Sequence, residues 1–379
     1  MLRSMREEWN IDFANNGQDA LERLAQEPYD VIISDVKMPG MDGVQLLTEV
    51  RTQYPHITRL LLTGQAEEET ILKAVGPAHQ FLSKPCDAEV LKTTISRTCA
   101  LSALLEAPTL KQLASQMISI PTLPSLYTEL VQVLEDPEST LEHISTIVAK
   151  DMGMTAKILK LVNSAFFGLP RQVSSPSQAI SFLGIETLKT LVLTVQVFEE
   201  LKPKHTTNFS IESLWEHSIQ TGDFARKIAQ AENLEEHLVS DTLAAGMLHD
   251  VGILLLATQL PDHFAEAIEL SNAQQVSLHE AERQILSASH AELGGYLLGL
   301  WGLRHPVVEA VAFHHQPKVI ETQQFTPLTA VHIANALHTE KEKSGEQREG
   351  QGIQDEYIDS IGLTAHLQSW RDICQVSMS

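Results

Sequence analysis

The residues best suited to chemistry in this sequence are His249 and Asp250, which are adjacent in an otherwise apolar stretch from Leu243 to Leu256. Burying a histidine beside a carboxylate is costly unless each finds a hydrogen-bond partner or a metal ion. Neutral imidazole and carboxylate groups are both good ligands for divalent metal ions. A metal site and a hydrogen-bonded pair in the core are therefore the two interpretations of this dipeptide.

Further histidines occur in similar surroundings, on or at the end of segments with helical spacing of apolar residues. They are His217 in WEHSIQTGDF, His290 in HAELGGYLLGLWGL, and His314 and His315 in AVAFHHQP. Together with AGMLHDVG around His249, these stretches resemble the HD superfamily of metal-dependent phosphohydrolases. The resemblance is closest to its HDOD branch and covers residues 118–337.

This resemblance implies a ligand role for each histidine. His217, His249 and Asp250 match the first three ligands of the basic metal site. The added histidines of relatives that bind two or three metal ions are matched by His290, His314 and His315. The metal that the resemblance implies is iron, manganese or zinc.

Three departures from the family pattern argue against efficient hydrolysis. Asn335 stands where the fourth ligand, an aspartate, is expected, and an amide oxygen binds a hard cation more weakly than a carboxylate does. Ile253 replaces a lysine that often follows the HD pair, which removes a contact for substrate phosphate. The loop typical of cyclic-di-GMP phosphodiesterases is also missing. We therefore expect a degenerate metal site.

The other histidines lie in polar or loop contexts, and we place them at the surface. This set comprises His56, His79, His143, His205, His237, His263, His279, His338 and His366. His305 and His332 lie nearer to apolar segments and are weaker candidates for the pocket.

A second group of reactive residues follows short β-branched runs near the N-terminus. Asp35 ends YDVIISD, Thr63 lies in RLLLTG, and Lys84 and Pro85 follow QFL. Segments with helical spacing alternate with these runs, which predicts a doubly wound α/β fold with a parallel sheet and a site at the carboxyl ends of its strands. An acid, a hydroxyl and a lysine at this edge suit a phosphoryl group.

The order of Asp35, Thr63, Lys84 and Pro85, with MPGMDG after the acid, resembles a two-component receiver domain. The resemblance implies that Asp35 accepts phosphate from a sensor histidine kinase, with Mg²⁺ as cofactor. Thr63 and Phe81 would be the switch pair, and Lys84 would pair with the phosphate.

The start of the chain departs from the receiver pattern. Receivers normally begin with a strand that ends in an acidic pair for Mg²⁺, whereas residues 1–8 resemble the end of the first helix and lead into an expected strand at Ile11 to Ala14. We expect either a truncation of about twenty residues, judged by usual element lengths, or a decayed receiver. In both cases acetyl phosphate and Mg²⁺ should label Asp35 poorly.

Composition narrows the class of protein. The 379 residues suffice for two or three domains, and the net charge of −22 argues against direct nucleic-acid binding. No run approaches the ~18 uncharged apolar residues of a membrane helix, and the N-terminus lacks a signal-peptide core. Three cysteines without CxxC spacing suit a reducing compartment. We expect a cytoplasmic protein with no membrane segment.

The chain divides into five expected parts. They are a receiver domain at 1–100, a helical connector at 101–117, an all-α HD-type domain at 118–338, a flexible charged linker at 339–356 and a C-terminal helix at 357–379. The connector suits two roles equally: it can transmit movement or pair with its copy in a homodimer, or it can pack on its own domain.

The leading interpretation is a bacterial response regulator in which receiver phosphorylation controls the protein contacts of a non-catalytic HDOD output domain with an unknown downstream signalling protein. The alternative is a metal-dependent phosphohydrolase or cyclic-di-nucleotide phosphodiesterase, in which the metal activates water against a phosphoester. A third option is a sensor that binds a nucleotide or iron without turnover.

Overall fold

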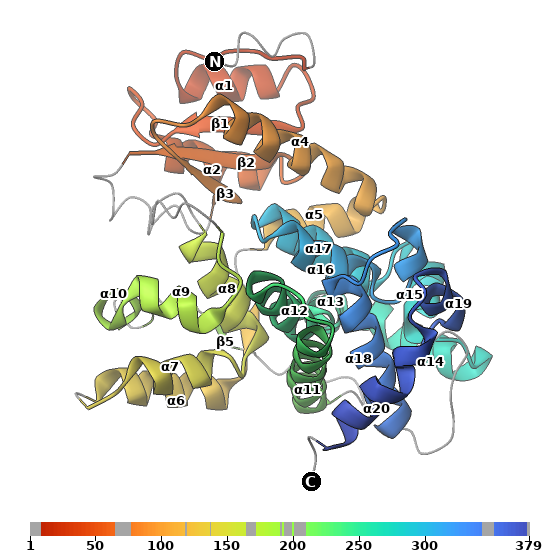
Figure 1. Cartoon of the computed structure of the whole chain (residues 1–379). Helices are drawn as coiled ribbons and strands as arrows, with labels where there is room; N and C mark the ends of the chain where they lie inside the picture. The colour runs from red at the N-terminus through yellow and green to blue at the C-terminus, as the bar shows by residue number, and fades with distance from the viewer. Residues whose placement is uncertain are drawn as a thin grey trace.

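The computed structural model describes residues 9–64, 77–117, 120–136, 138–163, 172–189, 192, 199–200, 210–342 and 352–376. An α/β unit at the N-terminus is followed by a large body of helices (Figure 1). This arrangement confirms the predicted fold class. The end of a first helix expected at residues 1–8 lies outside the described residues.

The α/β unit is built on a parallel sheet in the order β1-β2-β3. Its strands are β1 (Val31–Asp35), β2 (Thr58–Thr63) and β3 (Gln80–Ser83). Helices α1 (Gly17–Leu24), α2 (Gly43–Gln53) and α4 (Ala88–Leu104) accompany the sheet. The register pairs Asp35 with Leu62 and Thr63 with Ser83, so the acid and the hydroxyl end neighbouring strands at one edge.

The strand predicted at Ile11 to Ala14 is wrong, because these residues are irregular. In the receiver strand order 2-1-3-4-5, this segment would pair only with the first strand. None of the described residues supplies that neighbour, and an extended segment without a partner forms no ladder. A side-chain bond from Tyr29 Oη to Asp12 Oδ2, 2.8 Å long, holds the segment instead.

Beyond this unit, most of the described chain is helical. The helices are α5 (Pro108–Gln116), α6 (Pro124–Glu135), α7 (Leu141–Val148), α8 (Met152–Val162), α9 (Pro176–Leu183), α10 (Ile185–Lys189), α11 (Ile211–Ala231), α12 (Glu236–Leu248), α13 (Val251–Gln259), α14 (Pro261–Gln274), α15 (Leu278–Leu286), α16 (His290–Leu300), α17 (His305–Phe313) and α18 (Pro327–Glu342). One feature was not predicted: β4 (Pro121–Thr122) and β5 (Glu199–Glu200) form a short parallel pair.

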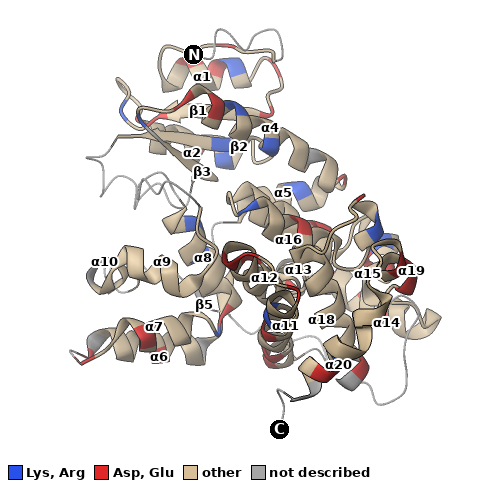
Figure 2. Ribbon diagram, in the orientation of Figure 1, with Lys and Arg blue, Asp and Glu red and all other residues tan. Residues whose placement is uncertain are grey.

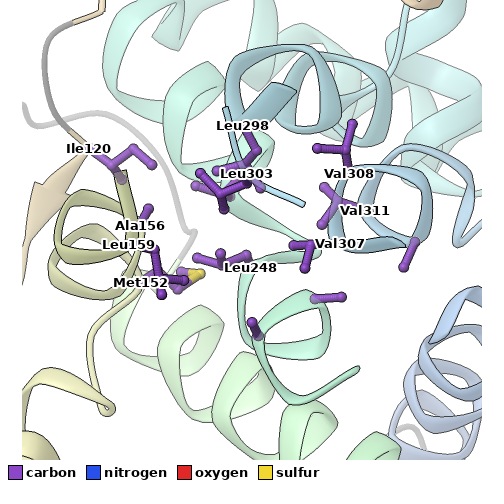
Figure 3. Packing of buried hydrophobic residues seen from close by; sticks show 14 of the residues in the cluster. Ile120, Met152, Ala156, Leu159, Leu248, Leu298, Leu303, Val307, Val308 and Val311 are labelled. Atoms are coloured by element: carbon purple, nitrogen blue, oxygen red, sulfur yellow. The ribbon is translucent and has the colours of Figure 1, made fainter. Parts of the chain in front are cut away.

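A single apolar core joins the helices of this body. Its members come from the first helices after the connector and from the helices that carry the histidines, as Figure 3 shows for Ile120, Met152, Ala156, Leu159, Leu248, Leu298, Leu303, Val307, Val308 and Val311. Leu248, which immediately precedes His249, is fully buried in this core. Because interiors are close-packed, the helix ends that carry the histidines are fixed relative to one another.

The stretch Glu236–Gln259 is, among the described residues, long and apolar enough to cross a membrane by length and composition alone. However, 78% of its most apolar window is buried inside the protein, as is usual for core helices. Figure 2 shows Lys and Arg distributed over separate elements of the described chain. The prediction that the protein does not bind nucleic acid stays a prediction.

The connector packs on its own chain. Pro108 begins α5, where the missing N–H of proline costs nothing, and Leu110 and Ala114 are buried. Gln80 Nε2 of β3 donates to Gly299 O of α16 at 3.2 Å. A Cβ on Gly299 would lie 2.5 Å from Leu101 of α4, so these two helices are in close contact. The receiver sheet thus touches the helix that begins with His290.

His79 lies in this contact, and its predicted surface position is wrong. Its Nδ1 accepts from Arg59 N at 3.1 Å, and its Nε2 lies 3.0 Å from Ser115 O of α5. The Arg59 guanidinium is also buried and donates to the carbonyls of Pro77 and Ser115. Local sequence around His79 is polar, but tertiary partners satisfy both ring nitrogens and permit burial.

The end of the chain differs from the prediction in two ways. Helix α18 continues to Glu342, beyond the expected end at 338, because residues 340–342 are good helix formers. The C-terminal segment 352–376 is not one helix: it consists of α19 (Asp355–Ser360), a 3-10 turn and α20 (Leu367–Val376). Gly362, with a φ of +73°, makes the break.

The carboxylate of Asp151 links three segments of the helical domain through hydrogen bonds. Its carboxylate accepts from Leu123 N (2.9 Å), Met154 N (2.8 Å) and Trp215 Nε1 (3.2 Å). Burial raises the pKa of Asp151 to about 6, although these hydrogen bonds favour the ionised form. The folded protein therefore binds a proton here more tightly than the unfolded chain does.

We expect Asp151→Asn to remove this pH dependence. The raised pKa contributes stability at low pH that is lost as the pH rises through about 6. The free energy of unfolding of the wild type, relative to that of the variant, should fall by about 2 kcal/mol from pH 4 to pH 7. Urea denaturation of both proteins at the two pH values measures this difference. A constant difference would contradict the prediction.

Candidate functional site

The residues predicted for the receiver lie together at the carboxyl edge of the sheet. Lys84 Nζ is 2.6 Å from Asp35 Oδ1, and both side chains are partly exposed. Thr63 is buried beside them, and its carbonyl accepts from Lys84 N at 2.7 Å. An exposed carboxylate with a lysine and a neighbouring hydroxyl can receive a phosphoryl group and balance its charge.

Three further residues belong to the description of the receiver domain. Phe81, the predicted switch aromatic, is buried in the receiver core with Leu61 and Ala78, and Pro85 follows Lys84 in the exposed loop. Gly43 is required at the start of α2, because a Cβ there would lie 2.0 Å from Asp35 O. The switch roles of Thr63 and Phe81 stay predictions.

The predicted metal ligands also come together, although they lie on different helices or at helix ends. His217 lies in α11, His249 and Asp250 between α12 and α13, His290 at the start of α16, His314 and His315 after α17, and Asn335 in α18. Gly252 allows the closest approach, since a Cβ there would lie 2.0 Å from His290 O.

Asp250 is the centre of this cluster. Its Oδ2 lies 3.2 Å from His249 Nε2 and 3.6 Å from His217 Nε2. The other oxygen, Oδ1, lies 3.3 Å from His290 Nε2 and 3.6 Å from His314 Nε2. Each carboxylate oxygen therefore faces its own pair of imidazoles.

Hydrogen bonds assign the tautomers in the first pair. His249 Nδ1 donates to Gly246 O at 2.7 Å, so a neutral ring carries a lone pair on Nε2. His338 Nε2 donates to Gln220 Oε1 at 2.9 Å, and its Nδ1 therefore accepts from His217 Nδ1, also at 2.9 Å. His217 Nε2 then carries a lone pair as well. The two Nε2 atoms lie 3.2 Å apart.

The second pair is arranged in the same way. His314 Nδ1 donates to Val311 O at 2.8 Å, and His290 Nδ1 donates to Glu282 Oε2 at 2.6 Å. His315 Nε2 lies 3.0 Å from His290 Nε2. In the part of the chain that the structure describes, the buried Nε2 of His314 has no hydrogen-bond partner.

These contacts test whether the residues fit a metal. Two groups of potential ligands, one of His217, His249 and Asp250 and one of Asp250, His290, His314 and His315, each have their ligand atoms within 4.8 Å of one another. In the first group, and at His314 in the second, imidazole lone pairs face a carboxylate oxygen with no proton between them, which is unfavourable unless a cation is present. The donor set of imidazole and carboxylate suits Zn²⁺, Mn²⁺ and Fe²⁺. The residues therefore fit one divalent cation in each group.

Electrostatics keep most of these imidazoles neutral. Burial lowers the pKa of His217 to about 3, and it lowers the pKa values of His314 and His315 well below their usual range. Since only the neutral ring binds a metal ion, this environment favours metal ligation near neutral pH.

His290 behaves differently. Burial alone would lower its pKa, but the charges of Glu282 and Asp250 raise it to about 10. Burial would likewise raise the pKa of Asp250, but His249 and the neighbouring imidazoles hold it well below its usual range. The two carboxylates thus attract a positive charge at His290, and a metal ion competes with the proton for that nitrogen.

Three residues at the site were missed or misplaced by sequence reasoning. Glu282 was not considered, and His279 and His338 were wrongly placed at the surface; all three are buried. The ring of His279 stacks on that of His315 with centroids 4.2 Å apart. Helical spacing offered a signal, because His279 and Glu282, and likewise Asn335 and His338, are three residues apart on one helix face.

The remaining candidate residues differ in their position relative to the two ligand groups. Asn335 lies close enough to His217 to influence its pKa, beside the first group. Ile253 is buried in α13. His332 is buried, and its Nδ1 donates to His314 O at 2.7 Å. His305, with an exposed side chain, pairs with Glu309 on the outside of α17.

Comparison with known proteins gives the family. A family model described as the HDOD domain matches residues 120–317, just over half of the chain, and a model of the response regulator receiver domain matches residues 1–96. An uncharacterized protein of Treponema pallidum is 29% identical over 262 residues, which cover 68% of this chain and 48% of that protein. The transcriptional regulatory protein ZraR of Klebsiella oxytoca is 32% identical over 119 residues, 31% of this chain and 27% of that one.

A solved structure shares the fold. The MmoQ response regulator of Methylococcus capsulatus superposes with a TM-score of 0.52 and 20% identity, covering 67% of this chain and 98% of that one. The chain spans about half the length of the first of these curated relatives and about a quarter of the second. It belongs to the HDOD family and joins its HDOD domain to an N-terminal response regulator receiver domain.

Proposed function

We propose that the HDOD domain of this response regulator holds two divalent cations that share Asp250, and that it hydrolyses a phosphoester under the control of the receiver. The observation that carries the proposal is the pair of Asp250 oxygens, each facing imidazole Nε2 atoms whose other nitrogens donate elsewhere. From the sequence we ranked a non-catalytic output first. We now rank hydrolysis first, because several imidazole lone pairs converge on the Asp250 carboxylate.

The cations would be held by the two groups already described. When bound, such ions supply Lewis-acid stabilisation of phosphoryl charge and a water that ionises near neutral pH. Glu282 holds the ring of His290, whereas Asn335 places a neutral amide beside His217. We therefore expect the first group to bind its ion more weakly than the second group.

The proposed input is phosphorylation of Asp35 by a sensor histidine kinase, with Mg²⁺ as cofactor. Phosphorylation shifts an equilibrium only when the phosphate interacts differently with two states of the protein. The contact from Gln80 to Gly299 supports a route to the output, because α16, which ends beside Gly299, begins with the ligand His290. We place this system in the cytoplasm.

Metal content and hydrolysis test the proposal together. We expect about two equivalents of metal in protein purified without chelator and loaded with Mn²⁺ or Fe²⁺, one for each group. Bis-p-nitrophenyl phosphate and cyclic-di-GMP are the substrates to try. Hydrolysis should stop after chelation and return with metal. Acetyl phosphate should label Asp35 only poorly in the wild type and not at all in Asp35→Asn, so any change in rate that it causes should be absent from that variant.

A second candidate is an output that acts through protein contacts without turnover. The neutral Asn335 and the apolar Ile253 favour it, because both remove groups that would bind a hard cation or a phosphate. Metal bound near two equivalents with no hydrolysis of either substrate would support this candidate. A protein that takes up no metal would contradict the leading proposal.

A further inference from the structure

The C-terminal segment 352–376 lies outside the matched HDOD region and yet contacts the candidate metal centre. Its helix α20, in dark blue, lies beside α18 (Figure 1). The residue before α19 is Gln354. It is the point at which this segment meets the pair His314 and His315.

Gln354 holds both carbonyls of that pair. Its Nε2 donates directly to His315 O at 2.7 Å. Its backbone N donates to His332 Nε2 at 3.1 Å, and His332 Nδ1 donates to His314 O at 2.7 Å. These bonds form a consistent set, because a neutral His332 carries one acceptor nitrogen and one donor nitrogen.

The carbonyls of His314 and His315 need such donors. His314 is the C-cap of α17, so the helix itself supplies no partner for its carbonyl. The chain then turns toward Pro317, and the backbone direction at this turn decides where the two imidazoles project. Fixing both carbonyls therefore fixes the starting point of two potential ligands.

The segment that supplies Gln354 is itself anchored at other points. Tyr357 Oη and Thr329 Oγ1 share a hydrogen bond of 2.8 Å, and Trp370 Nε1 donates to Glu232 Oε1 at 2.8 Å. Tyr357 and Trp370 are both almost fully buried. The bonds made by Gln354 thus belong to a docked element and not to a loose tail.

We propose that Gln354 is a positioning residue for the second metal group, through which the C-terminal segment sets the affinity of that group for its ion. The inference rests on the metal centre proposed above. The first group, with His217 and His249, receives no hydrogen bond from Gln354 among the contacts of the described residues, so the effect of Gln354 should be confined to one of the two ions.

The test uses the full-length protein with Gln354→Leu, which keeps the size of the side chain and removes its donor. The matched control is Gln368→Leu, because Gln368 lies in the same segment and bonds only locally, to Asp372. Mn²⁺ binding is titrated against a chelating indicator. We expect the affinity for one of two ions to fall about 10-fold or more in Gln354→Leu, as for other residues that orient a ligand, with the control unchanged.

A second readout needs no metal. The imidazole ¹⁵N resonances of the metal-free protein should shift for His315 in Gln354→Leu, while those of His217 and His249 stay in place. Equal weakening of both ions, or a lower unfolding midpoint with unchanged affinities and resonances, would overturn the role of Gln354. A wild type that binds no Mn²⁺ would instead contradict the proposed function. The resonances would still decide whether Gln354 positions His314 and His315.

Discussion

Asp250→Asn is expected to abolish metal binding at both groups of potential ligands. Asp250 is the residue that the two potential ligand groups share, and its two oxygens face different imidazoles. The amide keeps the shape of the side chain but loses the negative charge and one acceptor oxygen. Bound metal, measured by elemental analysis, should fall from about two equivalents to nearly none, and hydrolysis should fall by at least about 100-fold.

The control for this variant is Asp262→Asn, an exposed aspartate in the first turn of α14. It removes the same charge from the surface and should leave metal content and hydrolysis as in the wild type. If Asp250→Asn kept two equivalents, the carboxylate would not be a shared ligand. The remaining imidazoles would then have to bind the ions without it.

Glu282→Ala is expected to remove one ion and leave the other. Glu282 is fully buried and accepts both from the backbone N of His290, at 2.8 Å, and from its Nδ1, at 2.6 Å. Without this carboxylate the ring of His290 loses its orientation and its basicity, which typically lowers metal affinity about 10- to 100-fold. Metal content should therefore fall from about two equivalents to about one after dialysis.

Glu292→Ala is the matched control. Glu292 also serves the start of α16, where it accepts from Ser289 N at 2.7 Å and from Arg283 at 2.8 Å, but it touches no ligand. Its loss should cost about 1 kcal/mol of stability, as for other helix caps, with both ions retained. Equal loss of both ions in Glu282→Ala would show that the carboxylate supports the whole domain and not one group.

Local pattern predicted most of the elements and most of the reactive residues. Short β-branched runs ending in Asp35 and Thr63 predicted parallel strands, because such strands are buried on both faces and place their last side chains at one edge. Helical spacing around His249 and His290 predicted buried helices. The neighbouring apolar residues made the polar pair at 249 and 250 conspicuous, since buried charge needs compensation.

The sequence alone predicted candidate ligands for a phosphate or a metal ion and the elements on which most of them lie. The tertiary structure decided which groups contact these residues and form hydrogen bonds with them. Ile11 to Ala14 is irregular and is held by a side-chain bond from Tyr29 to Asp12, and His79 is buried because Arg59 and Ser115 contact it. The tautomers at Asp250 also depended on tertiary structure, because Glu282 and His338 reach the histidines from other helices and Gln354 does so from the C-terminal segment.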